Sequence, residues 1–124
     1  MNEANRSGSL MEIVYPEHTN SQGTLFGGHA LSLMDRLAFI VASRFTRMPV
    51  VTASSEKVSF LCPVKQGELV ELNGAVIDVG RTSLRLRIEM HREDLQSGDR
   101  SLCTTGEFVM VAVDDNGRPR PIPR

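Results

Sequence analysis

One stretch of the chain has the apolar period of an α-helix. Between His29 and Pro49, apolar side chains recur every three to four residues and form a broad stripe. The stripe consists of Ala30, Leu33, Met34, Leu37, Ala38, Ile40, Val41 and Phe45. Because the stripe is so broad, little of this helix can face water. The pattern predicts one long, mostly buried helix, preceded by a sharp turn at Gly27 and Gly28 and ended by Pro49.

Most of the remaining chain shows strand patterns bounded by glycine, proline and polar turn residues. The alternation is clearest from Ser83 to His91, where large apolar residues take every second position and polar residues lie between them. The expected strands are Leu10–Tyr15, Val50–Leu61, Glu68–Val79, Ser83–His91 and Cys103–Val113. Glu17–Gly28 is expected to form a long loop, of a kind that is often functional in compact domains.

This order of elements is a strand, a long loop, one apolar helix and then four strands. Strands grouped together beside one separate helix predict an α+β fold with an antiparallel sheet. A single helix is buried on nearly all sides when a curved sheet wraps around it. We therefore expect one domain over residues 10–124, with residues 1–9 as a disordered tail.

Composition and charge restrict the classes of function. The formal net charge of -1 gives no electrostatic sign of binding to nucleic acid or to an anionic membrane. No apolar run approaches the roughly 20 residues that cross a bilayer. The polar residues from Met1 to Ser9 lack the apolar stretch of a signal peptide. The sequence thus predicts a cytoplasmic protein that binds neither nucleic acid nor membrane.

The residues that commonly bind metal ions are not arranged as a metal site. Cys62 and Cys103 are far apart and neither belongs to a CxxC pair, which argues against a zinc site built on cysteine pairs. Two reduced thiols are expected, with a single disulfide as the alternative. No His, Asp or Glu cluster has metal-ligand spacing, and no serine stands in a GxSxG motif. We expect no metal and no cofactor.

Asp35 is the one acidic residue in the expected helix. At 100° per residue it lies between Leu31 and Ala42 on one side and Phe39 on the other. An aspartate on such an apolar flank loses hydration unless a polar group supports it. It is also too deep in the helix to act as a cap. Asp35 is therefore either a functional carboxylate or an aspartate that reaches solvent or pairs with an arginine.

The start of the helix offers a second chemical group. Backbone N–H groups of the first turn have no partner within a helix and carry partial positive charge. With glycines at positions 27 and 28, a carbonyl oxygen can approach these donors as an oxyanion hole requires. Asn20, in the preceding loop, either closes a turn or holds a water or a carbonyl through its amide. His29 and His91 have no partner at an informative spacing.

The segment from Gly80 to Ser83 joins two expected strands. It is either a plain hairpin turn or a place where Arg81 and the hydroxyls of Thr82 and Ser83 meet a phosphate-bearing ligand. Arg85 and Arg87 lie on the polar face of the following strand and would extend such a basic patch.

Together these motifs resemble the hotdog-fold acyl-CoA thioesterases of the YciA and cytosolic (brain-type) acyl-CoA hydrolase group. The sequence of Asn20–Gly28, followed by Leu33–Asp35, is similar to the NxxGxxFGG…MD pattern of that group. Later segments are similar to further motifs of the group: Val51–Ala53, Val58–Phe60, Pro63–Val64, Gly80–Ser83, Val111–Asp114 and Gly117–Pro119. The resemblance covers roughly Val14 to Pro123, nearly the whole chain.

The resemblance implies a hotdog fold, in which a curved five-stranded antiparallel sheet wraps one long central helix. It also implies a homo-oligomer, a dimer and often a trimer of dimers, that hydrolyses acyl-CoA to free acid and CoA without a metal. The implied catalytic groups are Asp35, Asn20 and the backbone of Gly28, with His29 beside it. The implied substrate or CoA contacts are Gly27, His29, Ser59, Phe60, Gly80, Arg81, Thr82 and Ser83.

Two mechanisms and two other functions remain open as alternatives. Asp35 acts either as a general base on water or as a nucleophile that forms an anhydride. A non-catalytic protein that senses acyl-CoA is the second function, although the presence of Asp35 and Asn20 argues against it. A hotdog hydratase would resemble enzymes with a histidine five residues after the aspartate. Ile40 stands there and argues against a hydratase.

Overall fold

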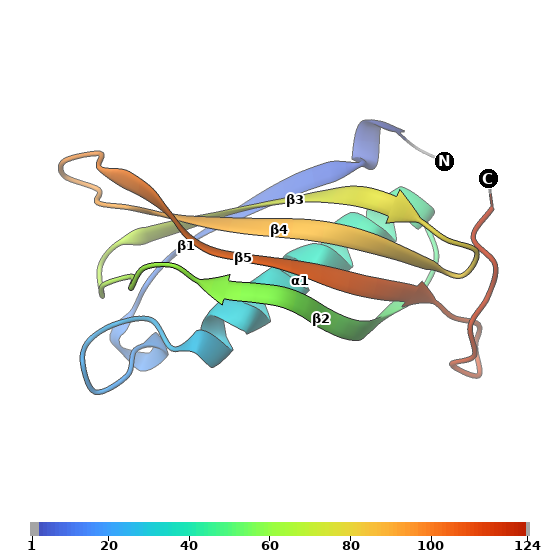
Figure 1. The fold of residues 1–124 in the computed structure, drawn as a ribbon, viewed down its shortest axis with the longest axis horizontal. Helices are drawn as coiled ribbons and strands as arrows, with labels where there is room; N and C mark the ends of the chain where they lie inside the picture. Colours follow the sequence, from blue (N-terminus) through green and yellow to red (C-terminus); the bar gives the residue numbers. More distant parts are fainter. Residues whose placement is uncertain (1–2, 124) are drawn as a thin grey trace.

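The helix α1 (Gly27–Thr46) lies along one face of a five-stranded sheet in this computed structural model, which describes residues 3–123 (Figure 1). The strands are β1 (Ser7–Ile13), β2 (Val50–Phe60), β3 (Leu69–Val79), β4 (Ser83–Glu93) and β5 (Arg100–Ala112). Two short 3₁₀ helices, η1 (Glu3–Asn5) and η2 (Pro16–His18), flank β1. No helix of residues 3–123 is both long and apolar enough to cross a membrane.

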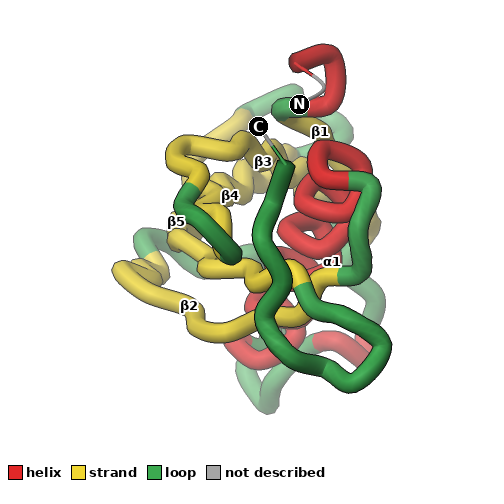
Figure 2. The backbone as a smooth tube through the Cα atoms, turned by 90° about the vertical axis from the view of Figure 1, so that its right-hand side faces the viewer, coloured by secondary structure: helices red, strands yellow, loops and turns green. Residues whose placement is uncertain are grey.

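The strand order in the sheet is β1-β3-β4-β5-β2, and every neighbouring pair is antiparallel. Figure 2 shows the sheet curving around α1, so that the two edge strands, β1 and β2, lie on different sides of the helix. The predicted α+β hotdog architecture, with one long helix wrapped by a curved antiparallel sheet, is confirmed.

The core lies between the helix and the concave face of the sheet. The alternation predicted for the fourth strand is present, since Leu84, Leu86, Ile88 and Met90 are fully buried while the residues between them are half-buried. Gly74 on β3 allows the helix to approach closely, because a Cβ there would lie 2.7 Å from Ile88 Cδ1 and 3.2 Å from a Leu37 methyl carbon. The apolar stripe of the sequence thus becomes the contact between α1 and the sheet, except at Ile40, which is 38% exposed. The prediction that little of the helix faces water is wrong, because Ser32, Arg36 and Phe39 are exposed as well.

The expected disordered tail over residues 1–9 is wrong for residues 3–9. They form η1 and the start of β1, which begins at Ser7 rather than at Leu10 and pairs with Ala75 of β3. Asn5 is buried, and its Oδ1 accepts a hydrogen bond of 2.9 Å from Arg44 Nη2. These small and polar residues are held by backbone pairing and side-chain hydrogen bonds, so they carry no apolar pattern. Met1 and Asn2 lie outside the described residues.

The ends of the helix also differ from the prediction. Gly27 and Gly28 form the first turn of α1 and do not precede it. The helix ends at Thr46, before Pro49, because Arg47 adopts a left-handed conformation with φ 54°. The long loop before α1 is held by two isolated bridges, Thr19 with Leu25 and Thr24 with Lys65.

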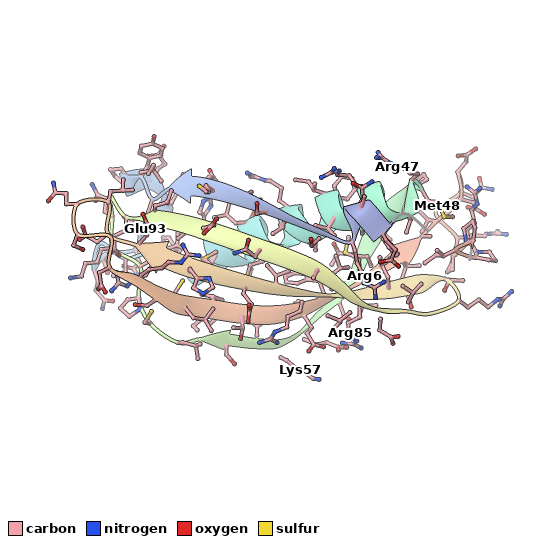
Figure 3. All side chains as sticks on the ribbon, turned by 90° about the horizontal axis from the view of Figure 1, so that it is seen from above. Arg6, Arg47, Met48, Lys57, Arg85 and Glu93 are labelled. Atoms are coloured by element: carbon pink, nitrogen blue, oxygen red, sulfur yellow. The ribbon has the colours of Figure 1, made fainter. Side chains whose placement is uncertain are left out.

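The outer face of the sheet carries a network of charges. Glu107 on β5 is buried there, and its carboxylate lies 3.1 Å from Arg85 Nη1 and 3.7 Å from Lys57 Nζ. Arg85 also pairs with Glu56, and Figure 3 shows Lys57 and Arg85 close together on this side of the molecule. Arg85 and Arg87 therefore contact carboxylates, which contradicts their predicted place in a free basic patch.

Candidate active site

The N-terminal end of α1 leaves backbone donors without partners. Its N-cap residue, Phe26, makes no side-chain capping bond, and the helical hydrogen bonds begin with Ala30 N–H donating to Phe26 O at 3.0 Å. The N–H groups of Gly27, Gly28 and His29 donate to no other group within residues 3–123. Three donors with partial positive charge therefore lie together at this end of the helix.

Asp35 lies about two turns further along the same helix. Its Oδ1 accepts a hydrogen bond of 2.5 Å from Thr52 Oγ1 on β2, and it takes part in no salt bridge among the described residues. Thr52 is therefore the polar group that supports the aspartate. Of the alternatives for Asp35, pairing with an arginine is not observed.

A pocket of about 370 Å³ opens beside this carboxylate, and we call it the Asp35 pocket. It is lined by Gly28, Leu31, Ser32, Asp35, Thr52, Ser55 and Phe108. Gly28 and Asp35 share it because positions seven residues apart lie on the same face of a helix. A Cβ added at Gly28 would meet nothing within 4 Å, so open space adjoins the backbone there. The pocket therefore brings together a carboxylate and an accessible stretch of helix N-terminus.

Asn20 lies in the loop before α1 and is not among the residues that line the Asp35 pocket. Its Oδ1 accepts hydrogen bonds from Gln22 N at 2.9 Å, from Thr24 N at 3.2 Å and from Thr24 Oγ1 at 3.1 Å. The carbonyl of Asn20 thus closes the loop. Its amide nitrogen donates to no group within the described part of the chain.

The residues of the turn from Gly80 to Ser83 are also not among those that line the Asp35 pocket. Gly80 N–H donates to Ser83 O at 2.7 Å, and the carbonyl of Arg81 accepts from Ile122 N at 2.8 Å. Thr82 O accepts from Ala112 N at 2.9 Å. The turn follows β3 at the end of the sheet where α1 finishes, opposite the N-terminal end of the helix (Figure 1).

Gly27 and Phe60 line a second pocket, of about 340 Å³, which we call the Phe60 pocket. Its other lining residues are Leu25, Ala30, Leu61, Cys62, Pro63, Val64 and Thr104. A Cβ on Gly27 would lie 3.5 Å from the Phe60 ring, so the ring packs against the helix backbone. Ser59 pairs with Thr105 on β5 and lines neither the Asp35 nor the Phe60 pocket.

His29 is engaged with a second histidine. Its ring stacks on that of His18 in η2, with centroids 3.8 Å apart and planes 6° apart. Burial, followed by the nearby His18, holds the pKa of His29 below its ordinary value. The imidazole of His29 thus packs against the loop, while its backbone N–H remains with those of the two glycines.

Thr52 is a residue that the sequence did not single out. It appears only inside a strand motif, and nothing in its surroundings along the chain distinguishes it from neighbouring polar strand residues. Gly28 and Asp35 share one helical face, so a polar residue on the strand that packs beside that face could have been expected as a partner. Which strand that is depends on the topology, since β2 follows α1 in sequence but pairs only with β5.

Neither cysteine is in a disulfide, as expected. Burial raises the pKa of the Cys103 thiol to about 11, and Cys103 Sγ lies 3.2 Å from Met90 O. Cys103 is therefore protonated at neutral pH and unsuited to nucleophilic attack. Within residues 3–123, no three His, Cys, Asp or Glu side chains are grouped so that they could hold a metal ion.

A family model described as "Thioesterase superfamily" matches residues 22–98, more than half of the chain. The chain belongs to the thioesterase superfamily. A Bacillus subtilis (strain 168) relative named "Uncharacterized acyl-CoA thioester hydrolase YkhA" is 41% identical over 111 residues. That match covers 90% of this chain and 64% of the relative, so the chain spans less than two thirds of that thioesterase's length.

Solved thioesterase structures share the fold closely. A crystal structure of an apo-hexameric acyl-CoA thioesterase superposes with a TM-score of 0.92 at 37% identity, over 97% of this chain and 77% of that chain. An acyl-CoA hydrolase from Staphylococcus aureus, in complex with butyryl coenzyme A, coenzyme A and coenzyme A disulfide, has a TM-score of 0.90 at 29% identity. That comparison covers 97% of this chain and 73% of the other. The predicted family is confirmed, and the relatives' names agree with the predicted function.

Variants of the Staphylococcus aureus enzyme identify three of its residue positions. Separate structures of it carry alanine in place of an asparagine, an aspartate or a threonine. In that thioesterase the three residues follow one another in the same order and at the same spacing as Asn20, Asp35 and Thr52 here. The threonine of this set is the residue that the geometry adds to those predicted from the sequence.

Proposed function

We propose that this chain is an acyl-CoA thioester hydrolase, which releases a carboxylic acid and CoA. One observation carries the proposal. The Asp35 carboxylate, held by Thr52, opens onto the pocket that the Gly28 backbone also lines, at a helix end with three unpaired N–H groups. The names of the relatives and the shared spacing of Asn20, Asp35 and Thr52 support it.

The reaction follows from this arrangement. The thioester carbonyl oxygen accepts hydrogen bonds from the N–H groups of Gly28 and His29, which stabilise the oxyanion as it develops. Asp35 takes a proton from a water molecule whose oxygen attacks the carbonyl carbon. The C–O bond forms, the C–S bond breaks, and the proton passes from Asp35 to the departing thiolate. Because Thr52 holds Oδ1, the other carboxylate oxygen is left to face the water.

The alternative role of Asp35 uses the same residues in a different order. The carboxylate attacks the carbonyl carbon directly, CoA leaves as the thiolate, and water then hydrolyses the resulting anhydride. Neither form requires a metal or a cofactor. Thioesters suit so small a set of groups because a thiolate leaves readily without prior protonation.

A second copy of the chain completes the proposed site. Neither Asn20 nor the turn Gly80–Ser83 lines the Asp35 pocket within one chain, and we propose that a partner brings them to the substrate. The edge strand β2 offers unpaired backbone groups, and the side chain of Val51 on this strand is 49% exposed. We propose a dimer through this surface and a trimer of such dimers, and the hexameric state named for one solved thioesterase is consistent with six copies.

In this assembly the remaining predicted residues contact the substrate. The Asn20 amide donates to the attacking water or to the thioester carbonyl. Arg81, Thr82 and Ser83 bind the phosphates of CoA through charge and hydroxyl groups, with Gly80 allowing the turn. Ser59 lies on β2, where it would contact CoA. The expected cytoplasmic location remains a prediction.

The direct test is release of CoA thiol from acetyl-, octanoyl- and palmitoyl-CoA, followed with a thiol-reactive dye. A substrate-free control corrects for labelling of the half-buried Cys62. Steady release from at least one substrate is expected. Tight acyl-CoA binding by calorimetry with no release from any of them would favour the sensor. Light scattering after size exclusion tests the assembly, and a monomer at working concentration contradicts the shared site.

A further inference from the structure

Two contacts of His18 join the segment before α1 to the helix itself. Its ring stacks on that of His29, with centroids 3.8 Å apart. Its carbonyl accepts a hydrogen bond of 2.9 Å from the N–H group of Phe26, the N-cap residue. Asn20 lies in this segment, which we call the Asn20 loop (residues 19–26). His18 therefore fixes the Asn20 loop to the end of α1 that carries the proposed oxyanion donors.

Charged groups from three elements act on the ring of His29. His18 belongs to η2, Glu12 to β1 and Arg36 to α1. Burial is the largest influence and lowers the pKa of His29; the charges of His18 and Arg36 lower it further, and Glu12 raises it. The neutral ring is therefore the form that suits the stack. Among these groups, only Glu12 favours the protonated form.

Glu12 has an acceptor that the neutral pair of rings leaves unused. Its Oε2 atom is buried, yet it accepts no hydrogen bond from any of residues 3–123. Arg36 Nη1 lies 3.6 Å from it, beyond the usual hydrogen-bond range, and the Arg36 side chain is 55% exposed. A buried carboxylate oxygen without a donor costs stability, and the N–H group of a protonated imidazole is a strong donor to it. Protonated His29 therefore has an acceptor available on β1.

Protonation also acts against the stack. Two positively charged rings 3.8 Å apart repel each other, and even in bulk water this repulsion changes a two-state equilibrium about fivefold. Histidine is the side chain whose ordinary pKa allows such a change of charge between about pH 5 and pH 8. Acid therefore favours a form in which His29 leaves His18 and turns to Glu12.

We propose that the stack of His18 on His29 is a pH-sensitive clamp, which holds the Asn20 loop on the N-terminal end of α1 near neutral pH and releases it in mild acid. In the released form, His29 pairs with Glu12. The inference rests on the proposed hydrolase function and adds regulation to it, because a released loop no longer places Asn20 and kcat falls. The two rings position the loop and take no part in the chemical step.

The protein contains a fluorescent probe beside the clamp. It has one tyrosine and no tryptophan, and the ring centroid of Tyr15 lies 6.3 Å from that of His18. The fluorescence of Tyr15 should therefore change when the clamp opens. A titration from pH 8 to pH 4.5 at constant ionic strength should show one transition, centred below about pH 6.5. Over the same range kcat should fall, about tenfold at one pH unit below the midpoint.

Two glutamate variants test whether Glu12 stabilises the open form. Glu12→Gln removes the carboxylate that pairs with protonated His29, so the midpoints of fluorescence and of kcat should both move to lower pH. Glu17→Gln makes the same chemical change at an exposed position next to His18, and Glu17 is not among the groups that shift the pKa of His29. This control should leave both midpoints in place. Equal midpoints in the two variants contradict the proposal.

A double variant removes the titration of the clamp altogether. His18→Phe with His29→Phe keeps two aromatic rings but leaves His91 as the only histidine. The fluorescence of Tyr15 should then stay constant over the range in which that of the unmodified protein changes. The ratio of kcat at pH 5.5 to kcat at pH 8, taken within each protein, should be higher in the double variant. If circular dichroism shows that Glu12→Gln does not fold, this double variant decides the proposal.

The outcomes separate this inference from the function on which it rests. No thiol release from any acyl-CoA at any pH rejects the hydrolase and, with it, the regulation of kcat. Hydrolysis whose loss in acid is the same in the unmodified protein and in every variant rejects only the clamp, because the loss then belongs to other groups, Asp35 among them. A fluorescence transition that responds to Glu12→Gln while kcat does not respond shows that the clamp moves without regulating the reaction, and the proposal fails.

Discussion

The two ends of α1 differ in whether their terminal backbone groups have hydrogen-bond partners. At the N-terminal end, Phe26 provides no side-chain cap, and the N–H groups of Gly27, Gly28 and His29 have no partner among the described residues. Phe26 itself is a large apolar residue that is 52% exposed. An end left in this state costs stability unless something outside the chain accepts these hydrogen bonds.

The C-terminal end is closed by its own residues. Thr46 Oγ1 donates to Ala42 O at 2.8 Å and accepts from Met48 N at 3.2 Å, while Arg47 N–H donates to Ser43 O at 2.7 Å. Arg6 lies over the ring of Phe45, 5.8 Å from its centroid. Figure 3 shows Arg6, Arg47 and Met48 together at this end of the molecule.

The capped C-terminal end of α1 serves the fold, whereas the uncapped N-terminal end lies beside the proposed reaction site. Helix ends that serve only the fold are commonly capped by side chains or by water, because a side-chain cap stabilises a protein by about 1 kcal/mol. The closed end of α1 follows that rule. The open end keeps donors, pocket and carboxylate within about two turns, which is what a reaction that develops negative charge on oxygen requires. Variants that change one end at a time can test this division.

The largest effect is expected from removing the carboxylate beside the open end. Asp35→Asn keeps the shape of the side chain but removes the base, so kcat should fall by about 10²–10⁴. Binding of CoA should persist, because the amide still accepts from Thr52. Thiol release and calorimetry measure the two quantities.

The control is Asp115→Asn, which changes an exposed aspartate in the turn after β5. It should leave kcat unaltered. If Asp35→Asn retains full activity at unchanged thermal stability, the carboxylate has no part in the reaction, and the open end of the helix needs another explanation.

A smaller loss is expected when the support of that carboxylate is removed. Thr52→Val keeps the volume but deletes the hydroxyl that donates to Asp35 Oδ1. The carboxylate is then free to rotate, and kcat should fall about tenfold, since a hydrogen bond to a charged group contributes about 1.5–3 kcal/mol at most. KM should change little. Thr52→Ser, which restores the hydroxyl, should recover most of kcat; a valine variant as active as the serine variant contradicts the positioning role.

The fold could be predicted from the sequence because one apolar stripe and several alternating strands allow few arrangements. The predicted disordered tail was wrong at Ser7 and Gly8, because these small residues belong to the first strand of the sheet. These pair with Ala75 and Gly74 through backbone hydrogen bonds, and backbone pairing leaves no apolar pattern to read. A Cβ at Gly8 would lie 3.1 Å from Val41, so this glycine serves close packing against the helix.

The candidate site was predictable only where its residues share one element. Gly28 and Asp35 lie on the same helical face, and the helical period alone places them together. Thr52 joins them from a strand whose position depends on the whole topology. Asn20 and Arg81 remain predictions, because neither is among the residues that line the Asp35 pocket in a single chain.

A side-chain cap at the N-terminal end of α1 should raise the stability of the protein and lower its catalytic activity. Phe26 already has the extended backbone of an N-cap, with φ -61° and ψ 135°. In Phe26→Ser, the new hydroxyl can accept from Gly28 or His29 N–H, the donors assigned to the oxyanion. The free energy of unfolding should rise by about 1 kcal/mol relative to Phe26→Ala, which removes the ring without adding an acceptor. Over the same pair, kcat should fall; a capped helix with undiminished kcat would show that these N–H groups do not contact the substrate.

The smallest effect concerns pH at the open end. Burial and the stacked His18 lower the pKa of His29, so the unfolded chain takes up a proton more readily than the folded one. Arg36 lowers this pKa further and Glu12 opposes the shift. The stability that comes from this pKa shift is complete above a pH of about 6.5 and declines as the pH falls below it.

The melting temperature should therefore drop by less than about 4 °C between pH 7 and pH 5.5. His29→Gln should remove part of that slope. A slope in His29→Gln equal to that of the unmodified protein would mean that the stacked pair does not link this end of the helix to pH.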